Sequence, residues 1–530
     1  MTAKEIIFEE EARGKLLKGI VKITDAIGCT LGPRGRNVGL EKGWGAPVII
    51  NDGHTIVRDI SFEDQYENMG ASMVKEVAGK LKETCGDGTT TASLILRAIV
   101  QNGVKFISSG ASPINLKRGM EKALEAILKS LTASAIPIKN QAETLAIATV
   151  AASGNQEIGK FISDAIQKVG KSGVVTIEEG KGTETTVELV EGMQFDRGYV
   201  SAYFCTNNDT MTIEMENAKF LIIDKKIASI QELLPILQSV AASGASLVII
   251  AEEIEGDALA TLVVNRLRGS LKVAAVKAPG FGDRRKAILQ DIAALTGATV
   301  ITEDAGIALK DATAEVLGSA DKIKINKDTT TIVNGHGKQE AINARIKQIE
   351  IEANNTTSSY DKEKLEERKA KLSGGVAVIK VGAPTEPEMK QKKQMFEDSL
   401  NSTKAALEEG IVPGGGVALL RASKAAESLK LQGDEELGLK IVIKACETPV
   451  KQIIENAGFD GAVLLNDVRE APTTHGFNAL TEKVEDLLAA HVIDACKVLK
   501  SCITHAVSVA GIILISEALI GDAPDDEAKQ

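Results

Sequence analysis

The chain has 530 residues and a mass of 56.0 kDa, enough for about three or four domains and several hydrophobic cores. Its 73 acidic and 62 basic side chains give a net charge of −11, which excludes a global attraction to nucleic acid or to an anionic membrane. Only 3% of the residues are aromatic, too few for a base-stacking platform along the chain.

The cysteines and histidines follow no pattern of a cross-linked or metal-bound protein. None of the six cysteines forms a Cys-x-x-Cys pair, and the first residues lack the apolar stretch of a secretory signal, so we expect a reducing, cytoplasmic environment. The five histidines lack zinc-ligand spacing. The uncharged stretch Ser501–Ser516 is broken by polar residues and falls short of the ~20 apolar residues of a membrane span, so no membrane contact is expected.

The first part of the chain, to residue 135, is predicted to be mostly helical. From Glu63 to Thr84, apolar side chains recur at intervals of three and four residues, which is typical of an amphipathic helix. Two short extended segments, Asn37–Leu40 and Ala46–Ile50, are expected to form a hairpin between helices.

Between about residues 190 and 375, short apolar runs alternate with helical patterns, as in a separate α/β domain. The predicted strands are Phe220–Ile223, Leu247–Ala251, Val273–Val276 and Thr299–Ile301. The predicted helices are Ser229–Ser243, Gly256–Arg268 and Arg284–Leu295. The charged stretch Lys338–Leu372 is expected to form two helices folded back on each other.

The helix predicted at Gly256–Arg268 has an unusually wide apolar face. Its apolar side chains cover about two-thirds of the helix circumference, whereas packing against one core needs a stripe of only roughly 100°. Either this helix is buried on most sides, or part of its apolar face is exposed for binding. Glycines border the α/β region at Gly192 and Gly374–Gly375, and they are either hinges or ordinary capping glycines.

The last ~120 residues are again predicted to be helix-rich, with an apolar segment at Val507–Leu514. Within them, the run Gly414–Gly416 directly precedes a predicted helix, Val417–Ser423. Such a glycine turn leaves backbone N–H groups free and is compatible with a bound phosphate or sugar.

The run Gly86-Asp87-Gly88-Thr89-Thr90-Thr91 ends one predicted helix and opens another. Free N–H groups and three hydroxyls favour an anion there, and Asp87 fits if Mg²⁺ lies between its carboxylate and the phosphate oxygens. A capped turn without a ligand is the alternative reading.

Two further turns and one helical carboxylate complete the candidates from the residues alone. They are the turn Thr30–Gly35, the turn Asn51-Asp52-Gly53 and Asp398 in a polar helix. Each has a simpler reading, an ordinary turn, a hairpin connection or a solvated surface carboxylate, but together they favour a nucleotide site.

Five long motifs in order along the chain resemble the group I chaperonins, the GroEL family. The motifs are TLGPRGRNV (Thr30–Val38), CGDGTTTA (Cys85–Ala92), VEGMQFDRGYVSAYF (Val190–Phe204), VKAPGFGDRRKAILQDIA (Val276–Ala293) and VPGGGVAL (Val412–Leu419). The resemblance covers essentially the whole chain and implies a multi-domain α and α/β fold. It further implies a helical equatorial domain at 1–135 and 410–530, a small intermediate domain at 136–190 and 376–409, and an α/β apical domain at 191–375.

The resemblance also implies the site residues. Asp52 and Asp398 would orient or activate the attacking water, and Asp87 would hold Mg²⁺. The nucleotide contacts would be Thr30, Leu31, Gly32, Pro33, Asp87, Gly88, Thr89, Thr90, Thr91, Gly415, Asn478, Ala479 and Asp494. The client- and lid-binding surface would be Tyr199, Ser201, Tyr203, Phe204, Leu234, Leu237, Leu259, Val263 and Val264.

By the same resemblance, the chain is expected to be an ATP-hydrolysing chaperone in the cytoplasm, with ATP and Mg²⁺ as cofactors and K⁺ as a further candidate. It would form homo-oligomeric seven-membered rings, stacked as a double ring, bind non-native polypeptides and enclose them under a GroES-type co-chaperonin. No nucleic acid or membrane partner is expected.

Several positions depart from the family pattern and keep a second hypothesis open. Asn51 replaces the usual Lys, Leu480 a usual Ala and Ala495 a usual Pro; Gln452 and Gly461 stand where charged residues are common, and the C-terminal Gly-Gly-Met repeat is absent. A non-cycling holdase or specialised ring subunit with weakened ATPase is therefore the alternative. A metabolic kinase or ligase is a third hypothesis, but the sequence offers no acceptor pocket for it.

Overall fold

The computed structural model describes residues 3–41, 47–152, 154–170, 173–180, 182–207, 210–302, 309–356 and 358–523. The chain divides into two compact units. The helical unit comprises Met1–Ser163 and Gln391–Gln530, and the α/β unit comprises Asp164–Lys390. The finer division into equatorial, intermediate and apical domains remains a prediction.

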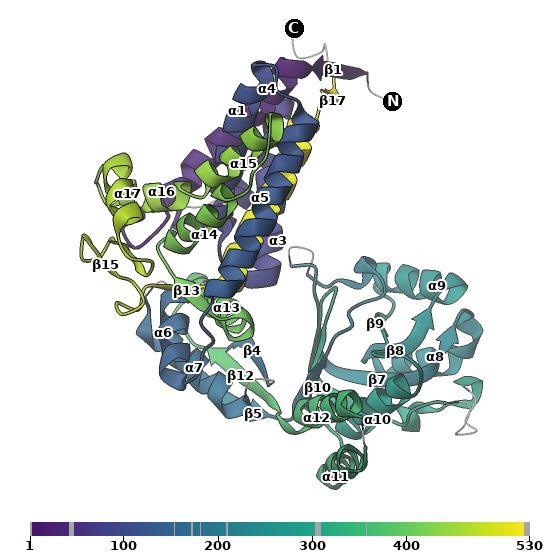
Figure 1. The fold of residues 1–530 in the computed structure, drawn as a ribbon. Helices are drawn as coiled ribbons and strands as arrows, with labels where there is room; N and C mark the ends of the chain where they lie inside the picture. Colours follow the sequence, from purple (N-terminus) through teal and green to yellow (C-terminus); the bar gives the residue numbers. More distant parts are fainter. Residues whose placement is uncertain are drawn as a thin grey trace. The chain divides into compact units, whose positions relative to one another are not determined.

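The helical unit contains both long helices that run side by side and shorter helices (Figure 1). In the first half of the chain these are α1 (Glu9–Gly28), α2 (Gly53–Asp59), α3 (Gln65–Cys85), α4 (Thr89–Ser108), α5 (Pro113–Ser134), α6 (Gln141–Ala151) and α7 (Gln156–Val169), which continues into the α/β unit. In the second half they are α13 (Glu386–Glu409), which begins in the α/β unit, α14 (Val417–Glu427), α15 (Asp434–Ala445), α16 (Thr448–Asn456), α17 (Gly461–Glu470) and α18 (Cys496–Ile515).

One apolar core joins the two sequence segments of this unit. Buried side chains of α1, α3, α4 and α5 pack with those of α14, α15 and α18. The predicted helix at Glu63–Thr84 is confirmed as α3, whose N-cap Asp64 accepts hydrogen bonds from the N–H groups of Tyr66 and Glu67.

The helical unit also contains short strand pairs. They are β1 (Lys4–Phe8) with β17 (Ala518–Asp522), β2 (Val38–Leu40) with β3 (Val48–Ile50), β13 (Ile411–Pro413) with β16 (Ile493–Ala495), and β14 (His475–Asn478) with β15 (Lys483–Asp486), all antiparallel. The pair β2–β3 confirms the predicted hairpin, although Ala46, at the start of its second segment, lies outside the described residues.

Among the described residues, α18 is the helix long and apolar enough to cross a membrane by length and composition. It has 20 residues and is longer than the sequence pattern suggested. It packs against α3, α4 and α5, and 61% of its most apolar window is buried in the protein. This helix is therefore a component of the protein core.

The α/β unit contains a mixed six-stranded sheet in the order β6-β11-β10-β7-β8-β9. Its strands are β6 (Gly192–Phe195), β7 (Ile213–Ile227), β8 (Ser246–Ile254), β9 (Lys272–Lys277), β10 (Gly318–Ile325) and β11 (Thr330–Gly335). The β7–β8 and β8–β9 pairs are parallel, as expected for strands joined by helices, and the other pairs are antiparallel.

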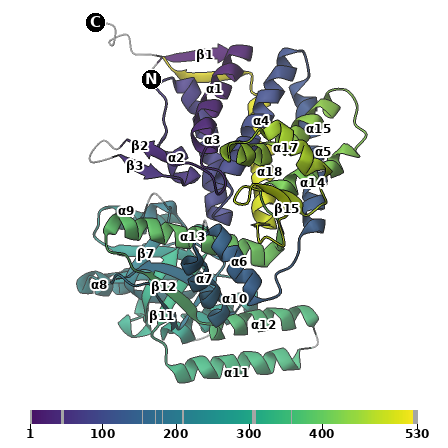
Figure 2. The same cartoon turned by 90° about the vertical axis from the view of Figure 1, so that its left-hand side faces the viewer.

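The helices of this unit are α8 (Leu234–Ser243), α9 (Gly256–Leu267), α10 (Gly282–Thr296), α11 (Gln339–Asn355) and α12 (Ser359–Ser373), with short 3₁₀ turns at η1 (Ala202–Phe204), η2 (Ile230–Glu232), η4 (Leu309–Asp311) and η5 (Ala314–Val316). The helices α11 and α12 lie side by side, as predicted for Lys338–Leu372 (Figure 2). A second, three-stranded sheet has the order β4-β12-β5, with β4 (Val174–Glu179), β5 (Thr186–Val190) and β12 (Val376–Val381).

Two expectations about this unit need correction. The segment Thr299–Ile301 is not a full strand, because only Ile301 makes an isolated bridge, to Ile223. The predicted helix Ser229–Ser243 is interrupted, because η2 forms first and α8 begins at Leu234 with Pro235 in its first turn.

Candidate functional site

The loop between α3 and α4 has the geometry of an anion site. Gly86 and Gly88 both have positive φ, at 72° and 88°, which lets the chain turn sharply into α4. Gly88 is the N-cap of α4 and supplies no side-chain oxygen to its first turn. The first N–H groups of a 20-residue helix therefore point toward the loop without a cap, next to the hydroxyls of Thr89, Thr90 and Thr91.

Asp52 is brought to this loop by the start of α2. It is the N-cap of α2, and its Oδ2 accepts hydrogen bonds from Thr55 N at 2.8 Å and Thr55 Oγ1 at 2.5 Å. A side chain on Gly53 would collide with Thr90 Oγ1, so the starts of α2 and α4 touch. Burial raises the pKa of Asp52, but the Lys82 charge and the Thr55 hydrogen bonds outweigh it and lower the pKa.

Asp398 reaches the same loop from α13. A Cβ on Gly86 would lie 3.1 Å from Asp398 O and 2.5 Å from Asn401 Cβ, so the loop packs directly on α13. The Asp398 carboxylate forms an ion pair with Lys82 of α3 and accepts a hydrogen bond from Gln394 Nε2 at 3.0 Å. Its side chain is only 20% exposed, so the reading of Asp398 as a solvated surface carboxylate is wrong.

Two further carboxylates lie together at the loop. Asp87 Oδ1 accepts a hydrogen bond from Gly88 N at 2.6 Å. Asp494 lies in β16 opposite Val412 of β13, and desolvation together with the Asp87 charge raises its pKa to about 7. Desolvation also raises the pKa of Asp87. Within the described ranges, neither carboxylate forms an ion pair, unlike Asp398.

The turn Thr30–Pro33 is joined to the segment at Asn478. Asn456 Nδ2 of α16 donates to Gly28 O at 2.9 Å and to Leu31 O at 2.8 Å, which holds the turn on α16. Arg34 Nε donates to Ala479 O at 3.3 Å. Gly415 lies just before α14, and a Cβ atom added to it would be 3.7 Å from Phe477 O.

The thirteen predicted nucleotide contacts and the two predicted water-activating carboxylates all belong to the helical unit. The contacts above link the Gly86–Gly88 loop and the start of α4 to Asp52 and Asp398, and they link the turn at Thr30–Arg34 to Ala479. Sequence reasoning missed Lys82, Gln394 and Thr55. The only available signal for Lys82 was its place five residues before Asp87, in the last turn of a helix that leads into the loop.

The chemistry of these groups fits ATP with Mg²⁺. Within the described residues, no group of three or more metal-ligating side chains occurs, so the protein alone provides no metal cage. Magnesium is commonly held by one or two carboxylates and the substrate phosphates, and Asp87 offers a carboxylate that forms no ion pair in the described part of the chain. The uncapped start of α4 offers N–H groups to the phosphates.

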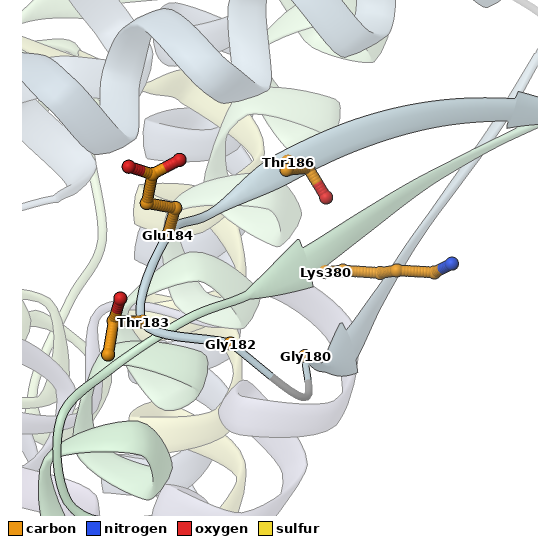
Figure 3. A pocket seen from close by; sticks show the side chains of 6 residues that line it. All are labelled: Gly180, Gly182, Thr183, Glu184, Thr186 and Lys380. Carbon is orange, nitrogen blue, oxygen red and sulfur yellow. The ribbon is translucent and has the colours of Figure 1, made fainter.

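A pocket elsewhere does not have this chemistry. A shallow cavity of about 390 Å³ lies in the α/β unit at the β4–β5 turn and β12 (Figure 3). Gly180, Gly182, Thr183, Glu184, Thr186 and Lys380 line it. The Lys380 ammonium is already paired with Glu188 at 2.5 Å, so it offers no free cation for a phosphate.

The predicted client-binding residues divide by exposure. Tyr203, Leu234 and Val264 are exposed, at 68%, 36% and 43%, and four others are partly exposed: Tyr199, Ser201, Leu259 and Val263. Phe204 and Leu237, however, are buried in the core of the α/β unit. The expectation that these two side chains lie on the surface is wrong in this structure, because Phe204 of η1 and Leu237 of α8 both belong to the buried apolar core of the unit.

The two readings of the helix at Gly256–Arg268 are also resolved. Only Ala258 and Leu262 of α9 are buried. Leu259 and Val263 are partly exposed, and Val264 and Leu267 are exposed. The helix is therefore packed on one face and presents the rest of its apolar arc to solvent.

Comparison with known proteins gives the class. The model of the TCP-1/cpn60 chaperonin family matches residues 23–524, and the chain is 67% identical over 524 residues to "Chaperonin GroEL 3" of Protochlamydia amoebophila (strain UWE25). That match covers 99% of this chain and 98% of the relative.

The chain therefore belongs to the TCP-1/cpn60 chaperonin family, within the group I (GroEL) branch. It is a chaperonin ATPase that assists protein folding, and the expected multi-domain α and α/β fold is confirmed. Members of this family bind ATP and Mg²⁺ in general.

Proposed function

We propose that the helical unit binds and hydrolyses ATP at the α3–α4 loop, and that the α/β unit captures non-native polypeptides on its exposed apolar side chains. The chain would act in homo-oligomeric seven-membered rings, stacked in pairs, with a GroES-type lid. The observation that carries this proposal is the convergence of Asp52, Asp87 and Asp398 on an uncapped helix start. The equatorial, intermediate and apical division at 1–135, 136–190, 191–375, 376–409 and 410–530 is part of the same proposal.

The phosphates would be held by the N–H groups at the start of α4 and by the hydroxyls of Thr89, Thr90 and Thr91. The turn Thr30–Pro33, Gly415 and Asn478-Ala479 would contact the rest of the nucleotide, and Asp494 would face its ribose. Asp87 would hold Mg²⁺, which when bound neutralises phosphate charge and polarises the γ-phosphoryl group.

Asp398 and Asp52 would act on the attacking water. The water oxygen forms a bond to the γ-phosphorus, while the bond from that phosphorus to the β–γ bridging oxygen breaks and ADP leaves with the electron pair. The water proton passes to the Asp398 carboxylate, and Asp52 orients the water. Burial raises the pKa of Asp398 to about 7, which suits a group that must accept a proton near neutral pH.

The client surface would comprise the apolar side chains that α9, α8 and η1 leave exposed. Val264, Leu234 and Tyr203 are its most exposed predicted members. Non-native chains expose apolar side chains, and burying these against such a surface is favourable without any specific sequence.

Three further parts of the proposal concern a second cation, the location of the protein and its other partners. K⁺ is included on the family resemblance alone. A cytoplasmic location is proposed because all six cysteines are free. The absence of nucleic-acid and membrane partners is proposed from the net charge of −11 and from the packing of α18 in the core.

The alternative of a non-cycling holdase is less well supported. All carboxylates proposed for hydrolysis are present and lie together, whereas a holdase would not need them. Leu480 is exposed, at 64%, so its greater bulk than Ala does not fill the protein interior.

The proposal is tested with two variants of the full chain. Asp398→Ala should leave ATP binding within about threefold of wild type and slow hydrolysis by about 10²-fold or more, because it removes a general base. Asp87→Ala should weaken both Mg²⁺-dependent binding and hydrolysis. Steady-state ATPase and calorimetric nucleotide binding measure the two effects. Normal hydrolysis by Asp398→Ala would overturn its role, and absence of ATPase in the wild type would favour the holdase.

A further inference from the structure

Lys82 is the one cation whose charge acts on all three acidic side chains, Asp52, Asp87 and Asp398, among the described groups of the site. It lies in the last turn of α3, where the helix leads into the Gly86–Gly88 loop. Its ammonium forms an ion pair with Asp398, 316 residues away in the sequence. Both side chains are largely buried, at 19% and 20% exposure, so the pair is only weakly screened by solvent.

The partners of Asp398 fix its carboxylate from two sides. Lys82 approaches from α3, and Gln394 Nε2 donates to the same oxygen, Oδ1, from one turn earlier on α13. Among the described residues, no hydrogen bond is formed to the second oxygen, Oδ2, which is left to accept a proton. A lysine on an adjacent helix therefore determines where this carboxylate lies relative to the phosphate loop.

We propose that Lys82 is a positioning residue of the ATPase, which holds the Asp398 carboxylate at the phosphate loop through their ion pair. Without Lys82, Asp398 would be a largely buried carboxylate facing the negative charge of Asp52 with only Gln394 as a partner. Such a group turns toward water or takes up a proton, and in either case it is misplaced for an attacking water. This inference rests on the proposed role of Asp398.

The main test uses Lys82→Gln in the full chain, with Lys80→Gln as the matched control. Lys80 lies on the same helix, is half-exposed, and pairs with Glu76 one turn earlier. Lys82→Gln should lower kcat by about 10- to 100-fold, the size expected for a misplaced catalytic group, and change ADP affinity by less than about threefold. Lys80→Gln should change neither. Lys82→Arg, which keeps a cation, should recover a large part of kcat.

A second test needs no hydrolysis. Thermal unfolding of the nucleotide-free protein is measured for Lys82→Gln, Asp398→Asn and the double variant. Lys82→Gln should lower Tm, and adding Asp398→Asn should restore part of the loss, because it removes the unpaired charge. Additive shifts in Tm would show that the two side chains do not act together and would overturn the proposal.

The remaining outcomes separate the inference from the proposed function. Normal kcat in Lys82→Gln together with slow hydrolysis in Asp398→Ala overturns the inference alone. Equal losses of ADP affinity and kcat would make Lys82 a nucleotide contact and also overturn it. Normal hydrolysis in Asp398→Ala overturns the proposed function itself.

Discussion

In the α/β unit, the Asp291 carboxylate of α10 is almost completely buried and accepts hydrogen bonds from two arginines, Arg345 Nε of α11 at 2.6 Å and Arg368 Nε of α12 at 2.8 Å. In the helical unit, Asp87 and Asp494 lie together at a loop, and among the described residues neither carboxylate forms an ion pair. The paired, buried carboxylate of Asp291 holds three helices together. At the loop, by contrast, the charge of Asp87 raises the pKa of the neighbouring Asp494, and such a site favours an added cation.

The exposure of apolar side chains differs between the two units in the opposite sense. The helical unit buries most of the apolar residues of α18 in its core. The α/β unit leaves Val264 and Leu267 of α9 exposed to solvent. In each unit, the groups left unpaired or exposed are therefore of the kind that the proposed ligand requires. These are charged groups for a metal–nucleotide complex and apolar surface for a non-native chain.

The largest effect is expected where a paired carboxylate is removed. Asp291→Asn should destabilise the α/β unit by about 3–5 kcal/mol, because it leaves two largely buried guanidinium groups without their anion. Asp87→Asn, which removes a carboxylate without a cationic partner, should leave Tm unchanged or raise it. Thermal unfolding of both variants in the nucleotide-free full chain measures the contrast. Similar Tm losses in the two variants would remove the distinction drawn between the units.

The sequence predicted the loops of the site better than its side-chain contacts. Glycine runs at Gly86–Gly88 and Gly414–Gly416 are local signals of a following helix. The first run opens a helix as predicted, which begins at Thr89, and the second helix begins at Val417, where it was predicted to begin. The burial of Asp398 was not predictable in this way, since its helix is polar and its partner Lys82 lies 316 residues away. Such a pair is set by tertiary packing, which a single sequence does not display.

In the α/β unit too, the hydrophobic periodicity of the sequence did not show which side chains tertiary packing would bury. A wide apolar arc on Gly256–Arg268 shows that more than one face is apolar, but not which part the sheet covers. The short turn η1 has no period at all, so the inward orientation of Phe204 beside the exposed Tyr203 gave no sequence signal.

Apolar exposure on α9 is tested by two serine substitutions on the same helix. Val264→Ser should reduce suppression of client aggregation while sparing ATPase and Tm, because Val264 is exposed and lies in the other unit from the nucleotide loop. Leu262→Ser is the buried control and should cost about 2–5 kcal/mol through cavity and desolvation effects. Early melting of Val264→Ser, or full capture with normal melting, would remove Val264 from the client surface.

A smaller effect is expected from pH. Burial and the Asp87 charge raise the pKa of Asp494 to about 7 from its ordinary 3.8, so the folded state binds a proton that the unfolded chain has already lost. The stability contributed by this proton is present below about pH 4 and is lost as pH rises through 7. Asp494→Asn should therefore melt higher than wild type at pH 8 and equally at pH 4. Asp467→Asn, an exposed carboxylate of α17, is the control and should show no such pH dependence. A pH-independent difference for Asp494→Asn would contradict the shift.

The smallest effect is expected at Asn51, the exposed residue before Asp52. Asn51→Lys adds a cation near a carboxylate that already feels the charge of Lys82. An exposed pair contributes about 0.2–1 kcal/mol, so ATP affinity or turnover should rise by no more than about fivefold, as measured by calorimetry and steady-state ATPase. Unchanged affinity and rate would show that Asn51 is a neutral replacement.

The same substitution is more informative in the Lys82→Gln background, because the effects of two cations that act on the same carboxylates are not additive. A larger gain there than in the wild-type background would show that Lys82 supplies charge the nucleotide site needs, while equal gains would separate the two positions.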